Sequence, residues 1–102
     1  MSASIHILEV GRVDSFRVPG LVLWFNSSDH LPPHFHAEKP GHWEVRVYFL
    51  REPKDMIGVR WQERKMTRKK IRQLVRAAAR HRAALYREWD KKVRPRTPGG
   101  EE

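Results

Sequence analysis

The side chains best suited to chemistry gather in one short segment, SSDHLPPHFHAE, which spans residues 27–38. It holds three of the six histidines of the chain within seven residues, together with two carboxylates and two adjacent prolines. Imidazole and carboxylate groups bind transition metals, transfer protons and cap unpaired backbone groups. The segment therefore admits three interpretations, namely a metal centre, an acid–base site or a structural corner.

The first interpretation is a metal centre. Alternate residues of an extended strand point to the same face, so His34, His36 and Glu38 would lie together. Two imidazoles and a carboxylate suit zinc, nickel or iron, and Asp29 or His30 could add a ligand or orient one. On this interpretation the cofactor is a divalent transition metal held by His34, His36 and Glu38. The other two interpretations require no cofactor.

The second interpretation is metal-free catalysis by His30, His34 and His36. Two histidines can divide the roles of general base and general acid, because the pKa of imidazole lies near neutrality. Cleavage of RNA by its own 2′-OH needs such a pair and a cation beside the phosphate, which a Lys or Arg of the C-terminal helix would supply. No pattern assigns a role to each histidine, so whether the protein is an enzyme stays open.

The third interpretation is structural. Proline has a fixed φ and no N–H group, so Pro32 and Pro33 set a rigid extended corner. Neighbouring imidazoles can then cap the backbone groups that the corner leaves unpaired, and Asp29 can close an Asx-turn. Phe35 would pack into the core.

Short strands separated by turn signals occupy the first 60 residues. Ile5, Ile7 and Val10 predict a first strand, and further strands are predicted within residues 21–26, 34–38, 43–50 and 56–61. The segment 43–50 alternates, with an apolar face of Trp43, Val45, Val47 and Phe49 and a second face of Glu44, Arg46 and Tyr48. This pattern favours a mainly antiparallel sheet of about four strands.

Residues 67–93 are predicted to form one long helix with Thr67 as its N-cap. Its apolar residues recur at helical spacing and form one stripe: Ile71, Leu74, Val75, Ala78, Leu85, Trp89 and Val93. A single α+β domain is therefore expected over residues 1–93, with the helix packed on the sheet. The Pro- and Gly-rich tail 94–102 is expected to be disordered.

Positive charge is concentrated in the second half of the chain. Residues 1–59 hold six Lys or Arg and seven acids, whereas residues 60–96 hold fifteen Lys or Arg and three acids. The predicted helix carries a basic ridge opposite its apolar stripe: Lys69, Arg72, Arg76, Arg80, Arg87 and Lys91. Such a ridge indicates an anionic partner, most commonly nucleic acid.

Composition narrows the classes of protein further. The chain has no cysteine, which excludes disulfides and thiolate metal sites. It has no run of about 20 apolar residues that could cross a membrane, and its first residues lack the apolar core of a signal peptide. We therefore expect a cytoplasmic protein without a membrane partner.

The histidine segment and its surroundings resemble a small prokaryotic family, domain of unknown function 4160. The resemblance covers about residues 5–93 and rests on a His-x-Pro-Pro-His-x-His core with flanking positions, here Ser27, Asp29, His30, Pro32, Pro33, His34, His36 and Trp89. It implies a sheet followed by a helix with a late Trp, and a role in toxin–antitoxin-like modules. Two features depart from the family: the helix is unusually basic, and Glu88 stands where an Asn is often found.

The leading functional hypothesis is a nucleic-acid-binding module, with RNA as the expected partner, in a toxin–antitoxin-like or stress-related system. One alternative is a His-dependent RNase or a metal-dependent hydrolase centred on HLPPHFH. Another is a protein–protein module whose basic helix docks on an acidic partner.

Overall fold

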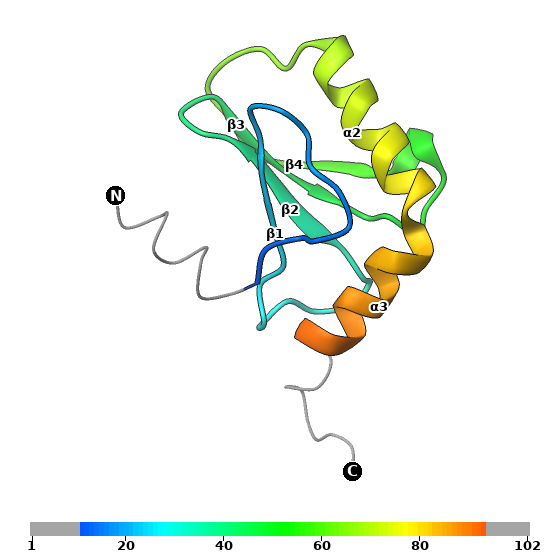
Figure 1. The fold of residues 1–102 in the computed structure, drawn as a ribbon. Helices are drawn as coiled ribbons and strands as arrows, with labels where there is room; N and C mark the ends of the chain where they lie inside the picture. Colours follow the sequence, from blue (N-terminus) through cyan, green and yellow to red (C-terminus); the bar gives the residue numbers. More distant parts are fainter. Residues whose placement is uncertain (1–10, 94–102) are drawn as a thin grey trace.

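The computed structural model describes residues 11–93 (Figure 1). The predicted first strand at Ile5, Ile7 and Val10 and the predicted disordered tail 94–102 lie outside the described residues. The described part is an α+β domain in which one sheet packs against two helices (Figure 1). None of its helices is both long and apolar enough to span a membrane.

The sheet has four antiparallel strands in sequence order, as the spacing of the turn signals predicts. They are β1 (Val22–Trp24), β2 (Phe35–Lys39), β3 (Trp43–Val47) and β4 (Ile57–Gln62), and a short 3-10 turn, η1 (Pro53–Asp55), precedes β4. The tight turn between β2 and β3 contains Gly41 at φ +79°, a backbone conformation that glycine adopts without steric cost. All three pairings in the sheet join strands that are consecutive in the sequence.

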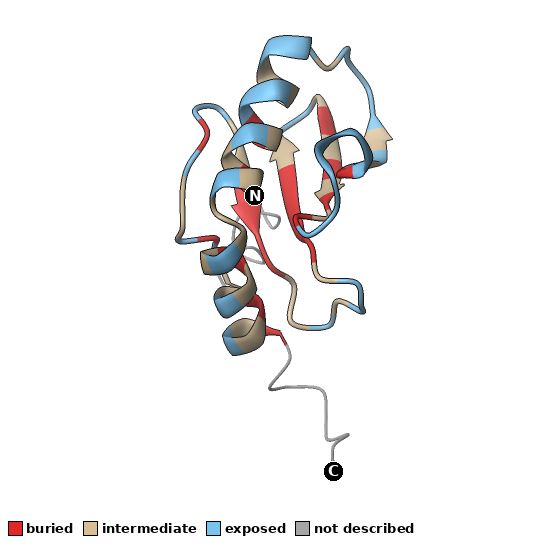
Figure 2. Ribbon diagram, turned by 90° about the vertical axis from the view of Figure 1, so that its right-hand side faces the viewer, coloured by how far each residue is buried: buried red, intermediate tan, exposed pale blue. Residues whose placement is uncertain are grey.

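The alternation of β3 defines the two faces of the sheet. Trp43, Val45 and Val47 are at most 1% exposed and face the core. Phe35 and Ala37 of β2 are fully buried on the same side, because Phe35 pairs with Val47 and Ala37 with Val45. Figure 2 shows buried stretches along the strands and exposed stretches along the helices. The second face therefore carries the polar residues of β2 and β3.

The C-terminal region forms two helices, α2 (Arg68–Arg80) and α3 (Arg82–Lys92), and the prediction of one continuous helix over 67–93 is wrong. The break is at His81, whose φ of −107° and ψ of 24° are not helical. Beyond it, α3 turns away from the line of α2 (Figure 1). The predicted N-cap is confirmed, because the Thr67 side chain accepts a hydrogen bond from the backbone N–H of Lys70 at 3.2 Å.

Tertiary contacts account for the break, since neither proline nor glycine lies near it. The ring of Phe16 stacks on His81 with centroids 5.3 Å apart. Arg82 donates from Nε to the Phe49 carbonyl and from Nη2 to the Arg51 carbonyl, both at 2.8 Å. These contacts hold the junction against the segment before β1 and the loop after β3, and sequence periodicity gives no sign of them.

Both helices bury the predicted apolar stripe against the sheet. Leu74 and Ala78 of α2 and Leu85 and Trp89 of α3 are at most 2% exposed. At about 1.5–3 kcal/mol for each large apolar side chain, this burial is the main force that holds the helices on the sheet. The outward sides of the same helices remain free to carry charge.

Candidate functional site

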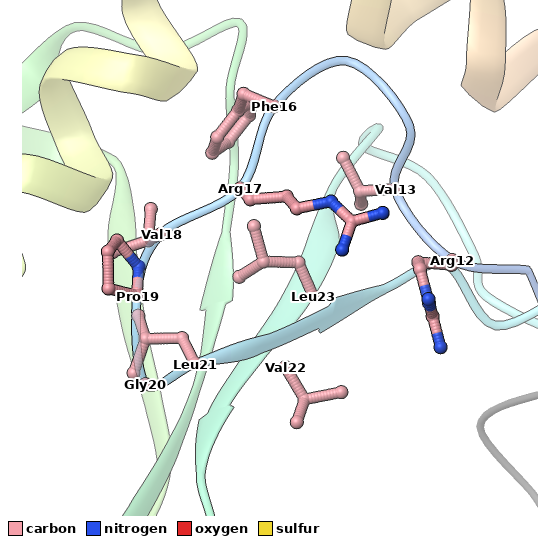
Figure 3. A pocket seen from close by; sticks show the side chains of 10 residues that line it. All are labelled: Arg12, Val13, Phe16, Arg17, Val18, Pro19, Gly20, Leu21, Val22 and Leu23. Atoms are coloured by element: carbon pink, nitrogen blue, oxygen red, sulfur yellow. The ribbon is translucent and has the colours of Figure 1, made fainter.

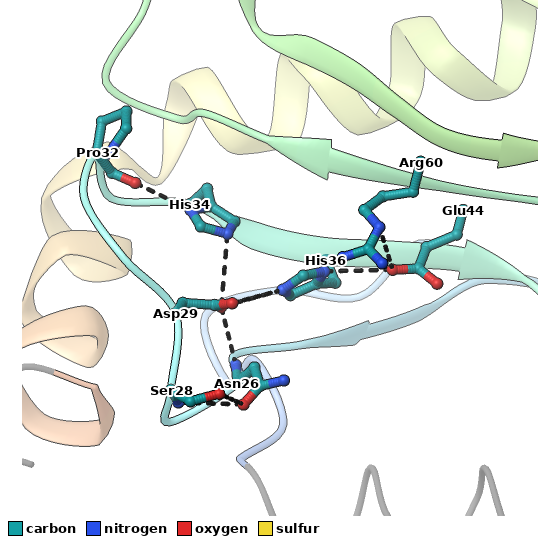
Figure 4. Close-up of polar contacts among 8 residues, drawn as sticks. All are labelled: Asn26, Ser28, Asp29, Pro32, His34, His36, Glu44 and Arg60. Carbon is teal, nitrogen blue, oxygen red and sulfur yellow. Dashed lines mark hydrogen bonds and ion pairs between the residues drawn. The ribbon is translucent and has the colours of Figure 1, made fainter.

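Two histidines and one carboxylate converge beside β2 (Figure 4). His36 lies on the face of the sheet opposite the core, and the ring of His34 also packs against Trp89 of α3, with centroids 5.8 Å apart. Asp29 lies in the loop after β1, His34 directly precedes β2, and His36 is the second residue of that strand. Asp29 Oδ2 is 3.0 Å from His36 Nε2 and 3.5 Å from His34 Nε2. One ligand atom from each residue lies within 4.8 Å of the others. Within residues 11–93 no other three His, Cys, Asp or Glu side chains meet in this way.

An Asx-turn places Asp29 over the strand. The Asn26 side chain accepts hydrogen bonds from the backbone N–H and the hydroxyl of Ser28, at 3.1 and 2.9 Å. Asp29 Oδ2 accepts one from the backbone N–H of Asn26 at 3.2 Å. The turn is therefore closed by Asn26 rather than by Asp29, and it leaves the Asp29 carboxylate directed at the two imidazoles (Figure 4).

The hydrogen-bond partners of the rings assign their tautomers. His34 Nδ1 lies 2.9 Å from the Pro32 carbonyl, which can only accept, so this nitrogen carries the proton. His36 Nδ1 lies 3.3 Å from Glu44 Oε2, also an acceptor when ionised. In both rings Nε2 is thus the nitrogen that faces Asp29. The Pro32 contact agrees with the structural interpretation, in which imidazoles cap the proline corner.

Neighbouring strands support His36. Glu44 of β3 also accepts a hydrogen bond from the indole N–H of Trp61 at 3.2 Å, and Arg60 Nε lies 4.0 Å from the same carboxylate. The indole of Trp24 stacks on the His36 ring, with centroids 5.1 Å apart and an interplanar angle of 16°. His36 is therefore contacted directly from β1 and β3, and β4 acts on it through Glu44.

The cluster is buried and electrostatically coupled. His34 and His36 are 5% and 3% exposed. Burial raises the pKa of Asp29, but polar contacts and charge interactions with the two histidines, when these are protonated, outweigh it and hold the pKa well below its ordinary value. Asp29 is therefore ionised at neutral pH.

The other two residues predicted for this region lie outside the cluster. His30 is exposed and makes no hydrogen bond or ion pair with the described residues. Glu38 shares the face of His36 but lies directly opposite Glu44 in the strand pairing. Burial, and then repulsion from Glu44, raise the pKa of Glu38. Asp29 thus occupies the place next to the histidines that the spacing of β2 assigns to Glu38.

Glu44 and Trp61 are the supporting residues that sequence reasoning missed. Strand alternation places Glu44 on the polar face, which is the one signal available. Its position beside His36 depends on the register between β2 and β3, in which His36 pairs with Arg46 and Glu38 with Glu44. That register appears only in the folded sheet.

The six residues of the predicted basic ridge, Lys69, Arg72, Arg76, Arg80, Arg87 and Lys91, are all exposed. None of them forms a hydrogen bond or ion pair with another residue of the described part. We call this set the outer basic face. Cations on the inner side of the helices are used by the fold: Lys70 binds the Pro19 carbonyl at 2.9 Å, and Lys92 binds Glu88 at 2.8 Å and Asp14 at 2.9 Å.

The outer basic face and the histidine cluster lie on different sides of the sheet. Figure 4 views the sheet from the cluster, and α2 lies behind it. Two cationic side chains of the sheet lie near the cluster: Arg46 of β3 pairs with His36 in the strand register, and Arg60 of β4 lies 4.0 Å from Glu44 Oε2. Within residues 11–93, no hydrogen bond or ion pair brings a cation of the helices to the histidines. Cleavage of RNA according to the second interpretation would require such a cation.

A separate hollow of about 510 Å³ follows residues 12–23 (Figure 3). It is lined mainly by apolar side chains, and its polar residues are Arg12 and Arg17. Because no acid or histidine lines it, it offers no group for metal binding or proton transfer.

These features define a small α+β domain with a buried Asp–His–His cluster and a basic helical surface. The chain belongs to the family described as a domain of unknown function (DUF4160), whose model matches residues 20–90. The match includes the whole cluster and most of both helices. Neither curated proteins nor solved structures gave a match to this chain.

Proposed function

We propose that the protein is a nucleic-acid-binding module that uses the outer basic face of α2 and α3, with RNA as its partner. The observation that carries the proposal is the contrast between the two sides of the helices. The inner cations Lys70, Arg82 and Lys92 bind carbonyls or carboxylates, whereas the six outer cations have no hydrogen-bond or ion-pair partner among the described residues. Unpaired clustered cations are suited to phosphates, because binding releases condensed counterions.

The spacing of the cationic side chains on α2 fits a linear polyanion as the ligand. Lys69, Arg72, Arg76 and Arg80 follow one another at intervals of three or four residues, so they lie along one side of the helix. At about 1.5 Å of rise per residue, this row is about 17 Å long. A row of that length suits successive phosphates of one strand better than a single small anion.

The first test is a salt titration with oligonucleotides of equal length as single-stranded RNA, double-stranded RNA and double-stranded DNA. Contacts to six phosphates predict that log K falls against log [salt] with a slope of about −4 for a single strand and about −5 for B-DNA. If RNA is the partner, the affinity for one of the two RNAs should exceed the affinity for DNA at the same salt concentration. Equal affinity for all three would refute that part.

The second test compares two variants of equal charge. Arg72→Glu/Arg76→Glu removes two outer cations, and Lys54→Glu/Arg64→Glu removes two exposed cations outside α2 and α3, one in η1 and one after β4. We expect the first variant to bind RNA at least about tenfold more weakly at physiological salt, with a slope flatter by about 1.4. The control should lose much less. Equal losses would mean that net charge alone drives binding, and would overturn the proposed surface.

The acidic-protein alternative makes the opposite prediction. A protein–protein module would bind RNA weakly at physiological salt and would co-purify with an acidic protein in a manner sensitive to Arg72→Glu/Arg76→Glu. The toxin–antitoxin-like or stress-related context stays a prediction from the resemblance, because the family description states no function.

A further inference from the structure

We propose that Asp29, His34 and His36 form a binding site for a divalent transition metal ion of the zinc class. The site is independent of the proposed nucleic-acid surface, since it lies on the other side of the sheet and uses none of the same residues. Four observations support it: the donor set, the orientation of the rings, the separations of the donor atoms, and a buried nitrogen without a hydrogen bond.

The donor set is the one that zinc, nickel and iron(II) accept. Two neutral imidazoles and one carboxylate also serve in zinc sites with three protein ligands, which leave a position for water. An aspartate with its ordinary pKa of about 3.9 is already ionised at neutral pH, so the Asp29 carboxylate is available as an anionic ligand. The chain has no cysteine, so no thiolate competes for the metal.

The rings are oriented as metal ligands are. A ligating histidine normally donates its other ring N–H to a carboxylate or a backbone carbonyl, which fixes the tautomer. His34 has the Pro32 carbonyl for this role at 2.9 Å, and His36 has Glu44 at 3.3 Å. Both Nε2 lone pairs are therefore directed at the Asp29 carboxylate. Glu44 is in turn positioned by the indole of Trp61.

The separations match a tetrahedral ion. With metal–ligand bonds of about 2.0–2.1 Å, ligand atoms around zinc lie about 3.3 Å from one another. His36 Nε2 is 3.1 and 3.0 Å from the two oxygens of Asp29, and His34 Nε2 is 3.5 Å from Oδ2. The histidine nitrogens and the carboxylate oxygen all fall within 4.8 Å. A small movement of the rings would complete the coordination geometry.

The strongest observation for a bound cation is the environment of His34 Nε2. The residue is 5% exposed, and this nitrogen makes no hydrogen bond. Its nearest polar neighbour in the cluster is a carboxylate oxygen, and two acceptors facing each other in a buried site cost free energy. A cation between them removes that cost. The cation is either a proton on each imidazole or one metal ion shared by all three residues, and the two states differ in measurable ways.

The experiment uses the full chain, dialysed against chelator and then titrated with Zn²⁺ by calorimetry at neutral pH. We expect one ion per chain and a rise in Tm that grows with free Zn²⁺. Co²⁺ should give visible absorption typical of a four-coordinate site with nitrogen and oxygen ligands, and Zn²⁺ should abolish it. Substoichiometric or absent binding would overturn the proposal in favour of two imidazolium groups paired with Asp29.

Two matched acid-to-amide variants locate the site. Asp29→Asn removes a ligand and should abolish the tight binding, whereas Glu38→Gln changes an acid on the same sheet face and should leave the Kd within about twofold. Glu44→Gln weakens the orientation of His36 and should raise the Kd about 10- to 100-fold. Loss of binding in Glu38→Gln but not in Asp29→Asn would refute the assignment and restore the ligand set predicted from sequence.

A measurement on the unmodified chain tests the site even if one of the variants fails to fold. Ring proton signals of all six histidines can be followed by NMR as Zn²⁺ is added. Stoichiometric Zn²⁺ should shift the signals of two buried rings and leave the exposed His30 unchanged. Shifts that appear first at His30, or equally at all rings, would show adventitious surface binding and would overturn the proposal.

Discussion

Glu88 joins α3 to the loop that precedes β1, and its replacement by glutamine is the most informative test of how this domain is held together. Its carboxylate accepts hydrogen bonds from the backbone N–H of Asp14 at 2.8 Å and of Ser15 at 2.7 Å. The Ser15 hydroxyl also donates to it, and Lys92 Nζ lies 2.8 Å away, one helical turn along α3. The side chain is 13% exposed.

The expected loss of stability follows from the hydrogen bonds that a glutamine side chain at position 88 can retain. One amide oxygen can retain the two donors of Ser15, but the amide NH₂ then faces the N–H of Asp14 and the ammonium of Lys92. Hydrogen bonds to a charged acceptor contribute about 1.5–3 kcal/mol each. Because water can reach Asp14, we expect Glu88→Gln to lower the free energy of unfolding by about 2 kcal/mol. For a domain of this size that corresponds to a fall in Tm of about 8–16 °C.

The pH dependence separates the charge from the shape of the side chain. Burial raises the pKa of Glu88, but hydrogen bonds from Lys92, Ser15 and Asp14 outweigh it, so the folded-state pKa lies below its ordinary value. A depressed pKa contributes stability that is fully present above the unfolded-state pKa and is lost as the pH falls through the folded-state pKa. The Tm difference between wild type and Glu88→Gln should therefore be constant from pH 7 to about 5 and shrink below about pH 4.

Thermal unfolding followed by circular dichroism between pH 2.5 and 7 measures this difference. Glu52→Gln is the control, because Glu52 is exposed and its side chain forms no hydrogen bond or ion pair with the described residues, so its effect should stay within about 0.5 kcal/mol. A Tm loss below about 3 °C in Glu88→Gln, or a loss of equal size at pH 7 and pH 3, would refute the reasoning that the ionised carboxylate fastens the loop to α3.

Two further predictions concern stability. Glu38→Gln should raise the free energy of unfolding at pH 7 by about 0.5 kcal/mol, because like charges opposite each other in a sheet repel and Glu38 faces Glu44. The raised pKa of Glu38 means that its ionised form is disfavoured in the fold, so this gain should vanish below about pH 4, and a gain that persists there would contradict the electrostatic cause. Thr67→Ala should cost about 1 kcal/mol in urea unfolding, since the backbone N–H of Lys70 loses its cap, while Thr67→Ser should cost little. Equal losses in the two Thr67 variants would exclude the hydroxyl as the cause.

Local patterns of the sequence account for much of the fold. The alternation of residues 43–49 predicted which side chains face the core, and the burial of Trp43, Val45, Val47 and Phe49 confirms it. The short spacing of turn signals predicted antiparallel neighbours, and the strand order is the order of the sequence. These features are local, because a period of two residues and a turn are decided by neighbours along the chain.

In the helical region, local sequence patterns are not sufficient to predict the structure. Its apolar stripe continues through Leu74, Ala78 and Leu85 on both sides of the break, with Arg82 as an exception within it, so periodicity predicts a single helix. The break at His81 depends on Phe16 and on the carbonyls that bind Arg82, all of which are distant in the sequence. Helix propensity is weak enough for such contacts to override it.

The candidate site was likewise predictable in part from the sequence, and the rest depends on the tertiary structure. Residue types and spacing were enough to single out His34 and His36, and the charge pattern was enough to place the outer basic face on exposed sides of α2 and α3. Only the tertiary structure decided that Asp29, and not Glu38, joins the histidines, because the Asx-turn at Asn26 folds the loop over β2. Strand register placed Glu44 against His36, and packing of the helices on the opposite face separated the cluster from the basic surface. Spacing along the chain identifies groups capable of chemistry, but convergence in space depends on register and loop closure, which are properties of the whole fold.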